Sequence, residues 1–222
     1  MRMAVMTATR DDIEAVPRRA ADHLRFAGAS FARQRAMLET MLRQDTLLMD
    51  VLRGLRAAAL PDWLVTSGAI YNLVWNRLTG RPPHTGVKDI DVAYFDAADL
   101  SYAAEDRVIR SVGAAFAHLP LPLEIRNQAR VHMWFPERFH LPYAPLACSA
   151  ESLGRYATRA HAVAVRLEAD DSLVVVAPFG LDDIFSFRLV PNTALANRET
   201  HERKAARAKS TWPELTVVPW PE

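Results

Sequence analysis

Two aspartates two positions apart, Asp89 and Asp91, constrain this chain more than any other feature of its sequence. Residues 88–95 alternate as a β-strand, so both carboxylates leave one face while the apolar residues beside them point into a core. Carboxylates this close repel each other unless a cation neutralises them, and Lys88 is expected to point away. The pair therefore predicts a strand that carries a metal site. The alternative is that one Asp caps a turn and the other lies at a solvated edge.

A third acid, Glu124, lies between two apolar residues in another strand-like stretch. Alone it could be any exposed strand residue, but beside the Asp pair it becomes the preferred third carboxylate. Asp96 and Asp99 compete for that role, although they lie past the strand and resemble turn and cap residues. We therefore predict that Asp89, Asp91 and Glu124 are catalytic and hold Mg²⁺, or Mn²⁺ in its place, since carboxylate oxygens suit these ions.

The dipeptide Ser67-Gly68 follows a short apolar strand at 63–66 and opens a helix at 69–78. Glycine lets the backbone approach a phosphate closely, and the start of a helix offers unpaired amide donors. A two-residue turn is a weak motif in isolation, and its value comes from the two-aspartate strand that follows. Ser67 and Gly68 are therefore expected to contact the phosphates of a nucleotide.

Two polar residues soon after Glu124 are further candidates for nucleotide binding. Asn127 reaches the site only if its strand bends, and Arg130 at a helix start could meet a phosphate. The alternatives are that Asn127 caps the next helix and that Arg130 is solvated. Both residues are assigned here to nucleotide binding, with those alternatives open.

Together these motifs resemble the head of the DNA polymerase beta-type nucleotidyltransferase superfamily. They are nearest to the pattern of CCA-adding enzymes, a Gly-Gly-x-Val-Arg-Asp helix followed by Asp-x-Asp. From about residue 30 to the end, the chain resembles a bacterial nucleotidyltransferase-like family of uncharacterised proteins. The matching motifs are Gly-Ala-Ile-x-Asn-x-Val-Trp (68–75), Asp-Ile-Asp-Val-x-Tyr-Phe-Asp (89–96), Glu-x-x-Asn-Gln-Ala-Arg-x-His-x-Trp (124–134), Phe-Gly-Leu-Asp-Asp-Ile-Phe (179–185) and Pro-Asn (191–192).

The resemblance implies a Mg²⁺-dependent enzyme that transfers a nucleoside monophosphate from an NTP such as ATP to a hydroxyl acceptor, with Asn72 among the nucleotide-binding residues. The acceptor stays open between a small molecule, a protein hydroxyl and an RNA end. Two departures concern the phosphates: Tyr71 stands where the family pattern favours Arg, and Ser67-Gly68 replaces Gly-Gly. One alternative is a non-catalytic nucleotide- or partner-binding relative on the same fold. Another is a divalent-metal phosphohydrolase.

Helical and strand-like patterns are interspersed along the chain and predict an α/β (α+β) fold, a mixed sheet flanked by helices. We expect one nucleotidyltransferase-like domain, 1–222, in which 1–60 is an N-terminal helical segment broken near Gln44-Asp45 and 61–222 hold the catalytic core and its C-terminal elaboration. The other expected elements are a strand at 123–125, helices ending near 118 and spanning 129–139, 149–156 and 197–209, and a C-terminal β-hairpin of 162–168 with 172–177.

The formal net charge of +1 argues against long nucleic acid as a partner. A local basic group does occur in the helix at 197–209, where Arg203, Lys204 and Arg207 share one side. Solvent exposure of this side is the default, and contact with a phosphate-bearing acceptor is the alternative. The seven His residues lack the spacing of a zinc site.

The lone Cys148 favours a reducing, cytoplasmic location over a disulfide-forming compartment. No uncharged run is long enough to span a bilayer, so no membrane partner is expected. The apolar start is short and soon meets Asp11, Asp12 and Glu14, which argues against a signal peptide.

Overall fold

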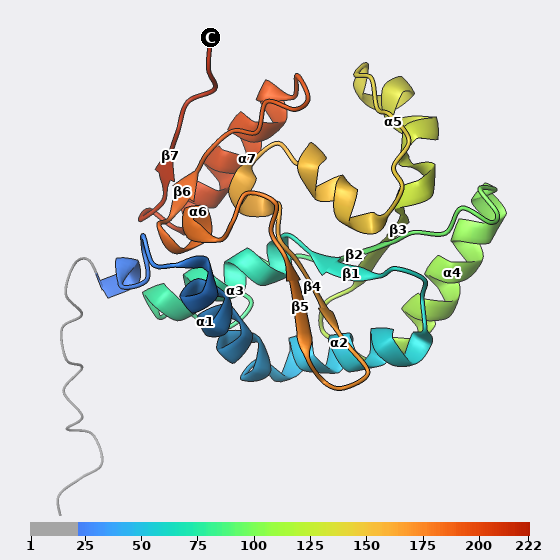
Figure 1. Cartoon of the computed structure of the whole chain (residues 1–222), viewed down its shortest axis with the longest axis horizontal. Helices are drawn as coiled ribbons and strands as arrows, with labels where there is room; N and C mark the ends of the chain where they lie inside the picture. Colours follow the sequence, from blue (N-terminus) through green and yellow to red (C-terminus); the bar gives the residue numbers. More distant parts are fainter. Residues whose placement is uncertain (1–21) are drawn as a thin grey trace, which may run out of the picture.

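The computed structural model describes residues 22–222, so the expectation about a signal peptide lies outside the described residues. Figure 1 shows the arrangement of the elements. The helices are α1 (Phe31–Arg43), α2 (Thr46–Ala58), α3 (Gly68–Thr79), α4 (Tyr102–Ala115), α5 (Val131–Phe139), α6 (Asp182–Phe185) and α7 (Arg198–Thr211). The strands are β1 (Leu64–Thr66), β2 (Ile90–Tyr94), β3 (Leu123–Asn127), β4 (Ala164–Leu167), β5 (Leu173–Val176), β6 (Arg188–Leu189) and β7 (Thr216–Val217). Short 3₁₀ helices are η1 (Asp22–Leu24), η2 (Gln128–Arg130), η3 (Ser149–Arg155) and η4 (Arg159–His161).

The main sheet has five strands in the order β3-β2-β1-β4-β5. β2 and β3 are parallel, and the other neighbouring pairs are antiparallel. The predicted α/β (α+β) fold with a mixed sheet flanked by helices is therefore confirmed. The expected hairpin is β4–β5, at one edge of this sheet. A separate pair, β6 and β7, joins the C-terminal tail to the chain after α6.

The N-terminal helices begin and end where the sequence indicates. Ser30 caps α1 by accepting from the Arg33 N–H, and Asp45 caps α2 by accepting from the Leu48 N–H. Leu55 on α2 is completely buried in the main core. Truncation of such a leucine to Ala costs about 2–5 kcal/mol, because the cavity collapses only in part.

β2 divides its side chains between the core and the opposite face of the sheet. Ile90, Val92 and Tyr94 are buried in the main core, whereas Asp91 leaves the other face. In Figure 1, α1 and α2 run along the lower side of the strands, and α5 and α7 stand above them. The face that carries Asp91 is therefore the one on which the candidate site is built.

Tryptophan side chains fix the C-terminal helix against α3. Trp75 is completely buried and donates from Nε1 to the Ile184 carbonyl at 3.0 Å. Trp212, the residue after α7, packs edge-on against Trp75 with ring centroids 5.1 Å apart. Its Nε1 donates to Oδ1 of Asn76 at 3.0 Å. These contacts determine where the side chains of α7 lie relative to α3.

One expected element differs in type. The stretch 149–156 is the 3₁₀ helix η3 where an α-helix was expected. None of the described helices is both long and apolar enough to cross a membrane. The division at residue 60 stays a prediction, although helices of 1–60 pack into the same buried core as the sheet.

Candidate functional site

Three carboxylates converge where β2 and β3 run side by side. Asp91 and Glu124 are register partners in this parallel pair, so their side chains leave the same face. Asp89 comes one residue before β2 begins. One carboxylate oxygen of each residue lies within 4.8 Å of the others. The convergence expected from the sequence is thus observed, and metal binding by these three residues stays a prediction.

The electrostatics of this cluster favour a cation. Burial, followed by the charges of Asp89 and Glu124, raises the pKa of Asp91 from 3.8 to about 6. Glu124 is exposed and pairs with Arg126 at 3.0 Å, which offsets little of the repulsion because exposed ion pairs are weak. A divalent cation among the three oxygens would remove the repulsion.

The turn before α3 has a strained backbone. Ser67 has φ 59° and ψ −115°, a conformation rarely populated by residues other than glycine, and its N–H donates to the Val163 carbonyl at 2.8 Å. Its hydroxyl does not cap α3, and its carbonyl accepts from the Ile70 and Tyr71 N–H groups, so the amides of Gly68 and Ala69 are the ones left for another partner. Ser67 and Gly68 both line the pocket in front of the carboxylates, as does Asn72.

Asn72 is a buried amide with an unused oxygen. Its side chain is 4% exposed, and its Oδ1 has no hydrogen-bond partner among residues 22–222. Buried amide oxygens are nearly always paired, so Asn72 stands out among the residues of this wall.

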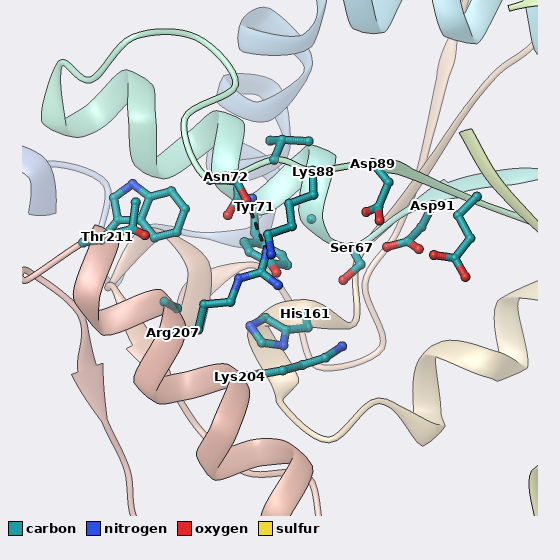
Figure 2. A pocket seen from close by; sticks show the side chains of 16 residues that line it. Ser67, Tyr71, Asn72, Lys88, Asp89, Asp91, His161, Lys204, Arg207 and Thr211 are labelled. Atoms are coloured by element: carbon teal, nitrogen blue, oxygen red, sulfur yellow. Dashed lines mark hydrogen bonds between the residues drawn. The ribbon is translucent and has the colours of Figure 1, made fainter. Parts of the chain in front are cut away.

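The pocket has a volume of about 240 Å³ and carries opposite charges on its two sides. Figure 2 shows Lys88, Lys204 and Arg207 reaching into it beside the carboxylates. The expectation that Lys88 points away is wrong, because β2 begins only at Ile90 and strand alternation does not extend to position 88. Lys204 and Arg207 are three residues apart on one side of α7, and Arg207 donates to the Gly86 carbonyl at 3.4 Å.

An aromatic stack forms another part of the wall. The rings of Tyr71 and His161 are stacked with centroids 4.6 Å apart, and Tyr71 also packs on Trp75 at 4.7 Å. Burial, followed by the charge of Asp91, raises the pKa of Tyr71 to about 12. Burial, followed by the charge of Lys204, lowers the pKa of His161 well below its usual range, so its imidazole is neutral at pH 7. No sequence pattern singled out His161, which meets the site only through the fold.

Asn127 and Arg130 lie off the wall of this pocket and have structural partners. The Asn127 side chain accepts from the Ala129 N–H at 3.1 Å and donates to the Asp96 carbonyl at 2.8 Å, which is the capping role left open above. Arg130 forms a buried ion pair with Glu105 and is neither solvated nor among the pocket residues. The structure thus brings Ser67, Gly68 and Asn72 to the carboxylates and leaves the other two candidates apart.

Asp96 and Asp99 have the turn roles that the sequence suggests. Asp96 accepts from the Ala98 N–H and Asp99 from the Ser101 N–H, both at 2.9 Å. Neither belongs to the carboxylate cluster. Glu124 is therefore the third acid of the site by position.

Comparisons with known proteins agree with this architecture. A solved structure titled "The NMR structure of the protein reveals a CCA-adding enzyme head domain" is similar to this chain, with a TM-score of 0.67 and 25% sequence identity. The alignment covers 84% of this chain and 96% of that one. A search among curated proteins found no match. Residues 53–217 match a protein family described as Nucleotidyltransferase. The chain belongs to this nucleotidyltransferase family.

Proposed function

We propose that the protein is a Mg²⁺-dependent nucleotidyltransferase that moves a nucleoside monophosphate from an NTP to a hydroxyl acceptor. The observation that carries this proposal is one pocket with three carboxylates on one side and three cationic side chains on the other. Carboxylates suit a divalent cation, and lysine and arginine suit phosphate oxygens. A nucleoside triphosphate with its metal ion presents both kinds of group.

The three carboxylates fit the metal ion, because their oxygens lie within 4.8 Å of one another and their negative charges repel each other. Asp89, Asp91 and Glu124 would hold it. When bound, Mg²⁺ supplies Lewis-acid activation of the hydroxyl and neutralises charge on the departing pyrophosphate.

The chain's own residues would then bind and orient the nucleotide. Lys88, Lys204 and Arg207 bind oxygens of the β- and γ-phosphates, and the first amides of α3 beside Gly68 bind a phosphate from the other side. Asn72 lies on the same wall, and its unpaired Oδ1 can accept a hydrogen bond there. These contacts hold the α-phosphorus near the carboxylates and in line with the attacking oxygen.

The transfer step balances without any further reactant. The acceptor oxygen forms a bond to the α-phosphorus, and the bond between that phosphorus and the β-phosphate oxygen breaks. The hydroxyl proton passes to a carboxylate oxygen of Asp91 or Glu124 that does not hold the metal ion. Pyrophosphate leaves with the bonding electrons, and the acceptor carries the nucleoside monophosphate.

A single experiment separates this function from its alternatives. The protein is incubated with ATP labelled in the α-phosphate, Mg²⁺ and a lysate metabolite pool, and products are identified by mass spectrometry. A nucleotidyl adduct plus pyrophosphate supports the proposal, and both should disappear in Asp91→Asn but persist in Asp50→Asn, which alters an exposed acid on α2. Release of inorganic phosphate without an adduct would indicate a phosphohydrolase. Mg²⁺-dependent ATP binding without turnover in any pool would indicate a non-catalytic relative.

A further inference from the structure

A second pocket lies beside the first, between α5 and α7. It has a volume of about 630 Å³. Figure 1 shows α5 and α7 on the same side of the sheet, with the segment from η3 to η4 between them. Phe135, Phe139 and Leu141 give it an apolar floor. A pocket of this volume accommodates a small organic molecule, whereas the 240 Å³ pocket is smaller than most pockets for such ligands.

The two pockets adjoin at a residue of α7. Lys204 belongs to the walls of both. Tyr156 lines the second pocket, and its hydroxyl donates to Oγ1 of Thr66 at 3.1 Å. Thr66 is in turn the register partner of Asp91 across β1 and β2. Burial, followed by the charge of Asp91, raises the pKa of Tyr156, which places this hydroxyl within electrostatic reach of that carboxylate. Tyr156 thus links the wall of the second pocket, through Thr66, to the strand position that carries Asp91.

The second pocket is electropositive. Arg198 pairs with a carboxylate of its own helix at 2.7 Å. Arg155, Arg203 and Lys204 have no carboxylate within 4.0 Å among residues 22–222. Cations on this wall outnumber acids: Arg155, Arg198, Arg203 and Lys204 stand against Glu199. The excess positive charge of this wall attracts an anionic ligand, whereas it does not attract a neutral nucleobase in this way.

From these observations we infer that the second pocket binds the acceptor, a small hydroxyl compound with an apolar or aromatic body and a carboxylate or phosphate group. The inference rests on the proposed function and names the substrate class for it. The apolar body packs on Phe135 and Phe139, the anionic group pairs with Arg155 or Arg203, and the hydroxyl points past Tyr156 toward Asp91. A peptide chain, an RNA end and the nucleobase of the NTP are the other occupants, which the test below distinguishes.

The test fills the pocket without touching the first one. Ala196 is exposed on the rim of the second pocket, so Ala196→Trp places an indole in it at little cost to folding. Ala206→Trp is the matched control, because Ala206 is exposed on α7 and lines neither pocket. Arg203→Glu is a second variant that reverses a charge on the wall.

The first measurement is transfer from α-labelled ATP to acceptors from a lysate. Protein and RNA are set apart, and the small metabolites are separated by ion exchange into anionic, neutral and cationic fractions before the reaction. The wild type and Ala206→Trp should form an adduct in the anionic fraction. Ala196→Trp and Arg203→Glu should lower its yield at least tenfold while ATP affinity stays within twofold. An adduct confined to the neutral, cationic, protein or RNA fraction overturns the inference. An equal loss of ATP affinity in Ala196→Trp also overturns it, since the pocket would then hold the nucleotide.

The second measurement does not depend on turnover. The aromatic sulfonate 8-anilino-1-naphthalenesulfonate should bind the wild type and Ala206→Trp, with its fluorescence enhanced, and should bind at least tenfold more weakly to the other two variants. Unchanged probe binding in those variants overturns the assignment of an anion-binding pocket. If the probe binds as expected but no fraction yields an adduct, the proposed transfer reaction fails while the ligand chemistry of the pocket is supported.

Discussion

Asp91→Asn should stabilise the metal-free protein at neutral and alkaline pH. The pKa of Asp91 is raised from 3.8 to about 6 in the folded protein, by burial first and then by Asp89 and Glu124. The native state therefore holds this proton more tightly than the unfolded chain, and stability falls as the pH rises from about 4 to about 6. The difference in pKa corresponds to a loss of about 3 kcal/mol above that window. Since the Asn amide keeps part of the desolvation cost, we expect a gain of about 1–3 kcal/mol at pH 8.

The assay is urea unfolding of both proteins at pH 4 and pH 8, with a chelator present. The free energy of unfolding of Asp91→Asn should exceed that of the wild type at pH 8. The two values should converge at pH 4, where the wild-type carboxyl is largely protonated. In a chain of this length, the gain at pH 8 corresponds to about 2–10 °C in Tm. Asp50→Asn removes an exposed acid 3.4 Å from Arg53 and should change stability by less than about 0.5 kcal/mol at either pH.

Adding Mg²⁺ with ATP at pH 8 should make the wild type more stable than Asp91→Asn. A ligand at about 1,000 times its Kd stabilises the native state by about 4.1 kcal/mol, which exceeds the gain expected for the variant, and only the wild type has the full set of carboxylates to receive it. Equal stability of variant and wild type at pH 8 would refute the idea that Asp91 is strained by like charge. An equal gain from Mg²⁺ and ATP in the variant would remove Asp91 from the metal site.

Four further substitutions test other parts of the pocket. A Cβ at position 68 would meet its nearest neighbours at 3.8 Å or more, so Gly68→Ala should fold normally yet bind ATP several-fold more weakly by calorimetry, with Mn²⁺ binding kept. Arg207→Gln should weaken ATP binding about tenfold, and the difference from wild type should shrink as salt rises, because the lost contact is charge-assisted. Tyr71→Arg should lower the free energy of unfolding by about 2–4 kcal/mol in a denaturant titration, because it buries a cation in the stack with His161. Trp212→Ala should weaken ATP binding but spare Mn²⁺ binding, because it frees α7 and leaves the carboxylates in place.

The sequence predicted the helices and strands that are long enough to show a periodic pattern of apolar residues. The break at Asp45, the hairpin and the long C-terminal helix all have either a clear cap or several turns of pattern. The stretch 149–155 has the composition of a helix start, but it winds as a 3₁₀ helix that local composition does not distinguish from an α-helix. β6 and β7 have two residues each, too few for any alternation to show.

The carboxylates of the site were readable because each lies on or beside a strand with apolar neighbours. Their convergence was predicted, but the parallel register of Asp91 with Glu124 that produces it is a tertiary property that no local pattern shows. Arg130 shows the reverse case. It reads as a phosphate ligand or a solvated base until α4 supplies Glu105, from 25 residues earlier in the chain, as a buried partner. Local pattern therefore identifies candidate groups, and the fold decides which of them share a pocket.

The side chains of α7 offer a physical explanation for Tyr71, which stands where the family pattern favours Arg. A cation at position 71 would be packed against His161 and Trp75, where part of its hydration is lost. In the proposed function the phosphate-binding charge comes instead from Lys204 and Arg207, on a helix more than a hundred residues further along the chain. That helix lies in place because Trp212 packs on Trp75 of α3, the same helix that presents its first amides to the pocket. The absence of arginine at position 71 thus favours another source of positive charge in the pocket. The three carboxylates are present, which favours the metal-dependent nucleotidyl transfer proposed above.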